Sequence, residues 1–260
     1  TTDNDTAGFT LSKTTATVSE GATTDTYTVV LDAQPDSNVV ISVTSADTGE
    51  ATVSPATLTF TSANWSNAQT VTVTGVDDTL ADGSQSTTIT MSVVDESSDN
   101  NFDALDDQTV TATTTDNDTA GFTLSTTTAT VTEAGGTATF TVVLDVQPVG
   151  NVVIDVTSGD TGEATVSPAS LTFTTGDWDS AQTVTVTGVD DNVIDVDTQT
   201  TITMSVVDES SDNNFDALDD QTVTATTTDN DTAGFTLSKT TATVSEGATT
   251  DTYTVVLDAQ

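Results

Sequence analysis

Short runs in which apolar and polar residues alternate dominate the chain. In one run Tyr27, Val29 and Leu31 share one face, while Thr26 and Thr28 point to the other. Alternation with a period of two is the pattern of a half-buried β-strand. The pattern recurs at Phe9 and Leu11; Val39, Ile41 and Val43; Leu58 and Phe60; Val71 and Val73; Ile89, Met91 and Val93; and Val110 and Ala112. These runs predict about seven short strands.

Turn-forming residues separate the runs, as in Gln34-Pro35-Asp36 and Asp47-Thr48-Gly49. Pro, Gly and Asp favour tight turns between strands. No segment shows helical periodicity over a useful length, and the abundant Thr suits exposed strand faces, where β-branched residues are favoured. The pattern therefore predicts an all-β chain.

A repeat organises these strands. The string TTDNDTAGFTLS begins at Thr1, Thr114 and Thr227, a spacing of 113 residues, and residues 227–260 repeat residues 1–34 letter for letter. Each copy has the length of one β-sandwich domain. The fold class we predict is tandem immunoglobulin-like antiparallel β-sandwiches arranged end to end. The predicted boundaries are 1–6 for the end of a preceding repeat, 7–118 and 119–231 for two complete repeats, and 232–260 for the beginning of a third.

The chain is strongly acidic, with 2 basic residues, Lys13 and Lys239, against 41 acidic ones and a formal net charge of −39. Such a surface repels nucleic acid and anionic membranes, because both need basic residues to displace counterions. Hydrophobic residues still make up 34% of the chain, and their alternation indicates folded sheets instead of disorder. Cations are the natural partners, since self-repulsion otherwise destabilises a compact state.

Several classes of protein are disfavoured by what the sequence lacks. It contains no His and no Cys, so triads and zinc sites built on these residues are excluded and no disulfide can form. There is no apolar run long enough for a membrane span and no signal-peptide pattern. Because the chain does not begin with Met, we interpret it as an interior part of a longer protein, and we expect no enzyme activity.

Four acidic features recur at matching positions. They are Glu20 (Glu133 and Glu246); Asp77 and Asp78 with Asp82 (Asp190 and Asp191 with Asp195); Asp116-Asn117-Asp118 (Asp3-Asn4-Asp5 and Asp229-Asn230-Asp231); and the loop from Asp95 to Asp103. The copies differ around these positions, yet the carboxylates are kept.

Calcium takes six to eight oxygen ligands, which no single short segment here supplies. The first three acidic features could supply them together, because alternate loops of a sandwich gather at one pole. The alternative interpretation is a set of solvated loop ends in a very acidic protein. For the loop from Asp95 to Asp103 we favour that alternative and expect the opposite pole.

The order TVSEG, then TVTVTGVDD, then TTTDNDTAGFTLS resembles Calx-beta-type and related cadherin-like repeats of very large bacterial surface proteins. The resemblance covers the whole chain. It implies immunoglobulin-like sandwiches with structural Ca²⁺ near the domain ends and an extracellular or cell-surface location. The metal ligands it implies are Glu20, Asp77, Asp78, Asp82, Asp116 and Asp118, with Glu133, Asp190, Asp191, Asp195, Asp229 and Asp231 in the later copies. Asn117 stands where many such repeats carry a third Asp.

Three functions compete at this point. The first is a calcium-stabilised extender of a surface adhesin or fibre, in which neighbouring repeats follow one another without a flexible linker. The second is a subunit of an extracellular filament or surface layer, in which the domains also associate laterally. The third is a carbohydrate-binding module that uses Trp65 and Trp178, although we interpret each Trp as a plug at a sandwich edge.

Overall fold

The computed structural model describes residues 5–259 and shows β-strands as the dominant structure. The chain divides into two compact units, Thr1–Thr119 (unit 1) and Ala120–Gln260 (unit 2). Within the described residues the helices are two single 3₁₀ turns, η1 (Asp95–Ser97) and η2 (Asp208–Ser210). None of the helices among those residues is long and apolar enough to cross a membrane. The predicted all-β class is therefore confirmed.

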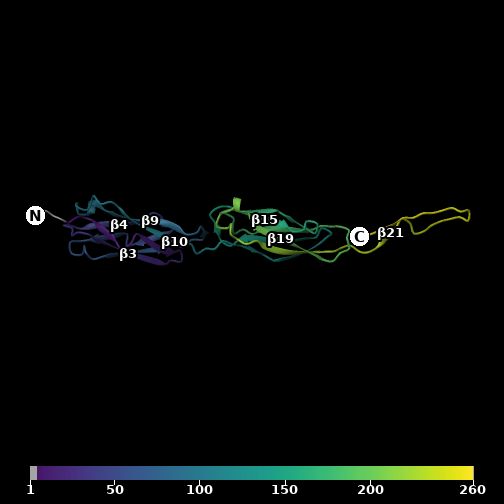
Figure 1. Ribbon diagram of the computed structural model, residues 1–260, viewed down its shortest axis with the longest axis horizontal. Helices are drawn as coiled ribbons and strands as arrows, with labels where there is room; N and C mark the ends of the chain where they lie inside the picture. The colour runs from purple at the N-terminus through teal and green to yellow at the C-terminus, as the bar shows by residue number, and fades with distance from the viewer. Residues whose placement is uncertain (1–4, 260) are drawn as a thin grey trace. The chain divides into compact units, whose positions relative to one another are not determined.

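The described residues of unit 1 form ten strands. They are β1 (Phe9–Leu11), β2 (Thr15–Ser19), β3 (Thr24–Leu31), β4 (Val39–Ser45), β5 (Ala51–Ser54), β6 (Thr57–Phe60), β7 (Gln69–Gly75), β8 (Leu80–Ala81), β9 (Gln85–Val93) and β10 (Gln108–Thr115). One sheet has the order β1-β3-β7-β5 and the other the order β2-β10-β9-β4-β6. Figure 1 shows β3, β4, β9 and β10 running along the unit. β2 pairs in parallel with β10, and the remaining pairs of the two sheets are antiparallel.

The core lies between these two sheets. Its largest side chains come from both, with Tyr27 on β3 and Met91 on β9, and the Tyr27 hydroxyl donates to Met91 Sδ over 2.9 Å. The inward positions that the alternation predicts are buried, apart from Leu11 and Val93, which are half-buried at the margin. Burial of this apolar face is what stabilises such a sandwich.

One strand of the sandwich, β5, was not predicted, and β2 was expected only as the early strand that ends at Glu20. β2 buries only Ala16 and Val18, and β5 is four residues long with one fully buried position, Ala51. Runs this short and this poor in large apolar residues carry little periodic signal. β2 matters for function because it leads directly to Glu20.

Unit 2 repeats this arrangement. Its strands are β11 (Phe122–Leu124), β12 (Thr128–Thr132), β13 (Thr137–Leu144), β14 (Gln147–Pro148), β15 (Val152–Ser158), β16 (Ala164–Ser167), β17 (Ser170–Phe173), β18 (Gln182–Gly188), β19 (Thr198–Val206), β20 (Gln221–Thr228), β21 (Phe235–Leu237) and β22 (Val255–Leu257). The sheets have the orders β11-β13-β18-β16 and β12-β20-β19-β15-β17, while β21 and β22 form a hairpin of their own. The predicted boundaries at 118 and 231 and the end-to-end arrangement stay predictions.

A buried carboxylate organises the loop from Asp95 to Asp103. Asp99 is buried, and its Oδ2 accepts the backbone N–H groups of Asp36 and Ser37 at 2.7 and 2.9 Å. The hydrogen bond from the Asn101 backbone N–H, and after it those from Ser37 and Asp36, hold the pKa of Asp99 below its usual value. The loop meets the turn after β3, whereas Glu20 lies near the beginning of β3. It therefore sits at the opposite pole from Glu20, and Asp99 is a structural clamp and not a solvated loop end.

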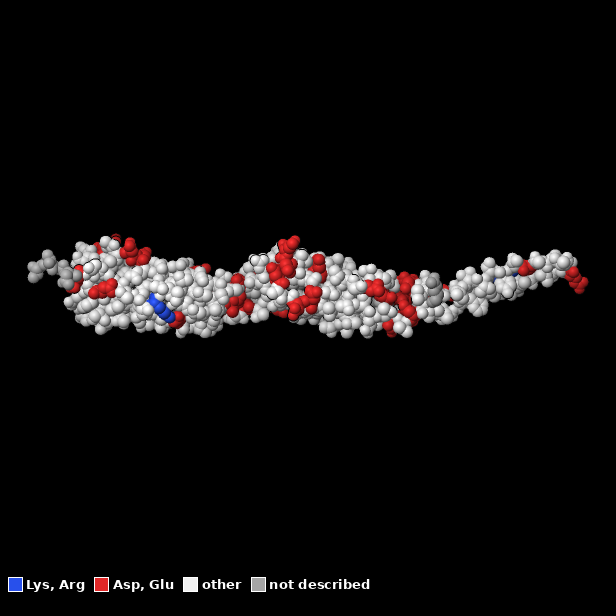
Figure 2. Space-filling view, viewed as in Figure 1, with Lys and Arg blue, Asp and Glu red and all other residues white. Residues whose placement is uncertain are grey.

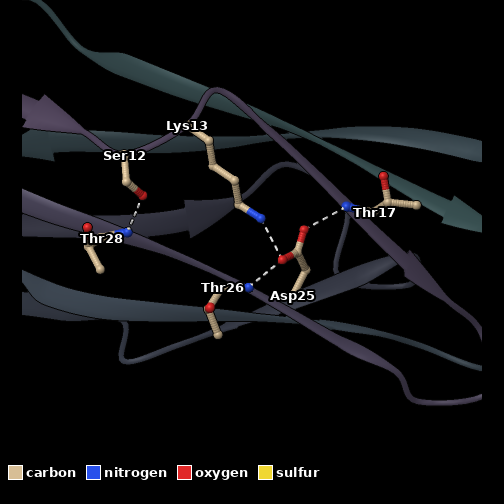
Figure 3. Close-up of polar contacts among 6 residues, drawn as sticks. All are labelled: Ser12, Lys13, Thr17, Asp25, Thr26 and Thr28. Carbon is tan, nitrogen blue, oxygen red and sulfur yellow. Dashed lines mark hydrogen bonds and ion pairs between the residues drawn. The ribbon is translucent and has the colours of Figure 1, made fainter.

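The ion pair of unit 1 joins β3 to the loop between β1 and β2 (Figure 3). Asp25 Oδ1 accepts from Lys13 Nζ over 2.5 Å, and Asp25 Oδ2 accepts from the Thr17 backbone over 3.0 Å. The Lys13 ammonium lowers the pKa of Asp25. In unit 2 both partners are replaced together, by Thr126 and Ala138. Each copy of the repeat therefore carries both residues of the ion pair or neither of them.

Candidate metal centre

Glu20 occupies the centre of the acidic pole in unit 1. It directly follows β2 and is 1% exposed, although it carries a carboxylate. Its Oε2 accepts the backbone N–H of Asn117 over 3.1 Å, and its own backbone N–H donates to the Thr115 carbonyl over 3.2 Å. The parallel pairing of β2 with β10 brings these distant segments together. A buried carboxylate with one hydrogen bond is an unusual core residue and points to a ligand role.

A glycine at the end of β7 allows this approach. A Cβ on Gly75 would lie 2.1 Å from the backbone carbonyl oxygen of Ser19, and Gly188 stands in the same relation to Thr132. No other residue permits the backbones to come so close. The Gly that ends each TVTVTG string therefore sets Glu20 beside the Asp-rich loop after β7.

Asp116 and Asp118 lie closest to Glu20 among the candidate ligands. Asp116 Oδ2 accepts the backbone N–H groups of Asp82 and Gly83 at 3.1 and 2.8 Å, and Asp116 Oδ1 accepts that of Asp118 at 2.6 Å. Gly83 has a φ of +73°, a conformation that glycine adopts without strain. One carboxylate oxygen from each of Glu20, Asp116 and Asp118 lies within 4.8 Å of the others.

The loop after β7 brings its carboxylates to the same pole. Asp77 Oδ1 accepts from the Asn117 side-chain amide over 2.7 Å, and Asp78 Oδ1 accepts from the Leu80 backbone over 2.8 Å. Asp77, Asp78 and Asp82 all act electrostatically on Asp118. The structure thus brings together all six predicted residues of unit 1, while their role as metal ligands stays a prediction.

Sequence reasoning missed a seventh carboxylate, Glu50. Glu50 follows Asp47-Thr48-Gly49, which the sequence analysis interpreted only as a turn. Among the neighbouring carboxylates, Asp82 has the largest electrostatic effect on Glu50. A comparison of the two copies could have identified Glu50, since Glu163 stands at the matching position in unit 2. Its relation to the other acidic features depends on the pairing of β5 with β7, which the sequence does not show.

The negative charges of the cluster repel one another, which favours protonation of the carboxylates or binding of a cation. Burial, and then the neighbouring carboxylates, raise the pKa values of Glu20, Glu50, Asp82 and Asp118, with hydrogen bonds partly offsetting the effect at Glu20 and Asp82. Both causes disfavour the charged form. The only basic side chain of unit 1, Lys13, pairs with Asp25. Figure 2 likewise shows groups of red carboxylates and very little blue.

Several oxygens of the cluster have no hydrogen-bond partner among the described residues. They are the buried atoms Glu50 Oε2, Asp82 Oδ1 and Asp118 Oδ2. Leaving a buried polar atom unpaired costs about 1–3 kcal/mol, and more for a charged group. Bound oxygen-seeking cations relieve this cost, so the donor set fits a hard ion such as Ca²⁺.

Unit 2 repeats the cluster with one change. Glu133, Asp229 and Asp231 bring carboxylate oxygens within 4.8 Å of one another, and Glu133 Oε2 accepts the Asn230 backbone N–H over 3.2 Å. Asp190 Oδ1 accepts from the Asn230 side chain over 2.9 Å. Asp191 and Asp195 both raise the pKa of Asp231, after burial and Asp229.

The change concerns the loop after β18. Val196 replaces Gly83, and a β-branched residue disfavours the positive φ that Gly83 adopts. Because Gly83 donates its backbone N–H to Asp116 in that conformation, we do not expect the loop with Val196 to repeat this contact beside Asp195. Of the third set, Glu246 is exposed, while Asp3 and Asn4 lie outside the described residues.

The whole sequence was compared with known proteins. No family model matches it, and no curated protein matches it. Among solved structures it is similar to the calcium-binding domain CBD12 of CALX1.1, with 12% identity over 85% of this chain and 99% of that chain and a TM-score of 0.37. It is also similar to domains 4 and 5 of the S-layer protein SbsC, with 20% identity, 72% and 76% coverage and a TM-score of 0.32. These TM-scores are low, so the fold and the cluster rest on the strand pairing and contacts of this chain.

Proposed function

We propose that this chain is a calcium-stabilised structural spacer of a secreted or cell-surface protein. The observation that carries the proposal is the group of Glu20, Asp116 and Asp118, whose oxygens lie within 4.8 Å of one another with no basic residue beside them. The same group recurs in unit 2 as Glu133, Asp229 and Asp231. Two acidic clusters of the same design, each with one buried Glu and two half-buried Asp residues, favour a common kind of ligand over chance grouping of surface charge.

The residues divide into holding and positioning roles. Glu20, Asp116 and Asp118 supply the closest oxygens, and Glu50 and Asp82 supply buried oxygens without partners. Asn117 positions the set, since its backbone donates to Glu20 and its side chain to Asp77. When bound, Ca²⁺ supplies positive charge and replaces the missing hydrogen bonds. Its binding to the folded state alone stabilises that state by mass action.

A spacer role agrees with the rest of the chain. Asp116 and Asp118 directly precede the next copy of the repeat, so an ion there orders the residues that lead into it. A sugar-binding role draws less support from the tryptophans. Trp65 is half-buried against the core, and the backbone carbonyls of Trp65 and Trp178 accept the N–H groups of Leu31 and Leu144, each over 3.2 Å. This favours the interpretation of each Trp as a plug.

The experiment is thermal unfolding of the full chain with chelator, with Ca²⁺ and with Mg²⁺ at equal ionic strength, together with small-angle scattering. We expect Ca²⁺ to raise the melting temperature well above the Mg²⁺ value, because Mg²⁺ prefers smaller sites that retain water. The double variant D116N/D229N, which changes one candidate ligand in each unit, should lose most of this rise. Equal melting temperatures in Ca²⁺ and Mg²⁺ would show that screening alone acts and that the proposed site is wrong.

A further inference from the structure

The two acidic clusters differ in how firmly the loop that carries the later Asp is held. In unit 1 the backbone N–H groups of Asp82 and Gly83 donate to Asp116 Oδ2 over 3.1 and 2.8 Å. The Gln85 side chain donates to the Asp82 carbonyl over 3.0 Å. The first two hydrogen bonds join the loop after β7 to the segment after β10, and the third braces the loop itself. Two candidate ligands, Asp82 and Asp116, are therefore held in place without an ion.

Unit 2 lacks the residues that make these contacts. Gly83, Ser84 and Gln85 are replaced there by Val196, Asp197 and Thr198. The φ of +73° at Gly83 is a strained conformation for a β-branched residue such as Val196. The shorter Thr198 side chain donates to the Val196 carbonyl over 3.0 Å instead of bracing Asp195. Within the described part of the chain, the Asp229 side chain accepts only the Asp231 backbone N–H, over 2.6 Å.

The buried carboxylate oxygens without partners differ in the same direction. The cluster of unit 1 has three of them, Glu50 Oε2, Asp82 Oδ1 and Asp118 Oδ2, whereas the described residues of the unit 2 cluster have one, Asp231 Oδ2. An oxygen that is already buried and unpaired needs no further desolvation when an ion arrives. The unit 1 cluster is therefore closer to the arrangement that a bound ion requires.

From these contacts we infer that Gly83 and Gln85 are positioning residues that pre-form the unit 1 site, so that Ca²⁺ fills unit 1 before unit 2. The inference rests on the proposed function, because both clusters must bind the ion. In unit 2 the ion must also order the loop that carries Asp195. Ordering the backbone of one residue costs roughly as much free energy as a tenfold change in affinity. The dissociation constant of unit 2 should therefore exceed that of unit 1 by at least about tenfold.

Ligand charge acts in the opposite direction. Asp197 adds a carboxylate that Ser84 does not have, and more negative charge around a site raises its affinity for calcium. Asp197 is exposed, however, so water and salt screen its effect on an ion in the cluster. The cost of ordering the loop is not screened. Rigidity therefore decides the order of filling, and Ser84→Asp separates the effect of charge from that of rigidity.

Calorimetric titration of the full chain with Ca²⁺ tests the order of filling. D229N/D231N removes two candidate ligands of unit 2 and leaves the unit 1 site, and D116N/D118N does the reverse. We expect the D229N/D231N protein to bind Ca²⁺ at least about tenfold more tightly than the D116N/D118N protein. Absence of binding by the wild-type chain would mean that the proposed function is wrong as well. Binding with equal affinities, or tighter binding by unit 2, would overturn this inference alone.

Exchange of the loops assigns the difference to the named residues. In the D116N/D118N protein, V196G/D197S/T198Q should tighten binding by unit 2 at least about tenfold, and misfolding cannot produce a gain of affinity. In the D229N/D231N protein, G83V/S84D/Q85T should weaken unit 1 by a similar factor, whereas S84D alone should not weaken it. Unchanged affinities after both exchanges, or equal weakening by S84D alone, would contradict the positioning role.

Amide hydrogen exchange adds a measurement that does not depend on affinity. In chelator the N–H groups of Asp82 and Gly83 should exchange more slowly than those of Asp195 and Val196, because only the first pair donates to a carboxylate. Ca²⁺ should slow exchange in the second pair by the larger factor. Equal protection of the two pairs in chelator would overturn the inference.

Discussion

The backbone N–H of Asn117 donates to the Glu20 carboxylate over 3.1 Å, joining residues 97 positions apart. Glu20 follows β2, near the beginning of the sandwich, and Asn117 follows β10, at its end. The contact therefore forms only when the last strand closes on the first segment. Asn230 and Glu133 repeat it over 3.2 Å. The proposed cation site and the completion of each sandwich therefore share one buried carboxylate.

The variant Glu20→Gln separates two effects of this carboxylate: the destabilisation caused by its buried charge, and its proposed contribution to calcium binding. In chelator the variant should be as stable as the wild type or more stable, because it removes a buried charge that neighbouring carboxylates repel. In Ca²⁺ it should lose most of the calcium-dependent rise of unit 1, since a neutral ligand replaces a charged one. Thermal unfolding in both conditions measures the two effects.

The control for Glu20→Gln is Glu96→Gln, which removes one charge at an exposed position of η1. It should leave the calcium-dependent rise unchanged. An equal loss in both variants would mean that net charge, and not the cluster, sets the response to calcium.

The dependence of stability on pH should reverse between chelator and calcium. Folding raises the pKa values of Glu20, Glu50, Asp82 and Asp118 above their ordinary values of 4.5 for Glu and 3.8 for Asp. Without metal, their contribution is full below those ordinary values and is lost as the pH rises through the folded-state pKa values. The metal-free protein should therefore become more stable as the pH falls from neutral toward the ordinary values.

Asp99 and Asp25 limit that trend, because folding lowers the pKa of each. Their contribution is present above 3.8 and is lost as the pH falls through their folded-state values. In Ca²⁺ the slope should reverse, since protons compete with the ion for the same oxygens. Melting temperatures between about pH 4 and 8 in both conditions test this. Parallel curves would contradict a shared site.

The sequence predicts the inward faces of the long strands well, because alternation reports directly which side chains are buried. Tyr27, Ile41 and Met91 are each at most 1% exposed, as the pattern indicates. The recurrence of acidic residues likewise identifies three segments that the structure brings together. Both are local signals that repeat along the chain.

Other features depend on pairing between distant segments. Glu50 joins the cluster because β5 pairs with β7. The residues near Glu50 in the sequence do not indicate this pairing. Asp99 was interpreted as part of a solvated loop because that loop was expected at the opposite pole from the other acidic features, whereas its hydrogen bonds to the turn at Asp36 and Ser37 accompany burial of the side chain. The sequence of one segment indicates that it carries carboxylates and at which end of the sandwich they lie. It does not indicate which backbone N–H groups of other segments donate to them.

Gly75→Ala should disrupt both the fold and the site of unit 1. The added Cβ would lie 2.1 Å from the Ser19 carbonyl oxygen, so β2 must move away and carry Glu20 with it. We expect a loss of about 3 kcal/mol in unfolding free energy, at the upper end for overpacking. Denaturant unfolding and calcium titration of the same variant measure the two losses. Gly176→Ala is the matched control, because its Cβ would meet nothing closer than 4.0 Å, and a loss of equal size there would contradict the steric explanation.

The turn after Glu20 offers a change that should stabilise the protein. Ala22 has a φ of +58°, whereas Gly135 occupies the matching position in unit 2 with a φ of +78°. The left-handed region costs a residue with a Cβ about 1–2 kcal/mol, while glycine loses about 0.5–1 kcal/mol more on ordering. Ala22→Gly should therefore stabilise unit 1 by about 0.5–1 kcal/mol.

The reverse substitution gives an internal test of the same argument. A Cβ on Gly135 meets no atom within 4 Å, so Gly135→Ala changes backbone conformation without a clash. It should destabilise unit 2 by a similar amount. Gly21→Ala is the control, because its Cβ would meet only Ser19 Oγ at 3.8 Å and Ala134 already stands at the matching position. Native-state hydrogen exchange resolves the units separately, and opposite signs for Ala22→Gly and Gly135→Ala are the required result. Equal signs would mean that contacts, and not the left-handed backbone, decide the stability of this turn.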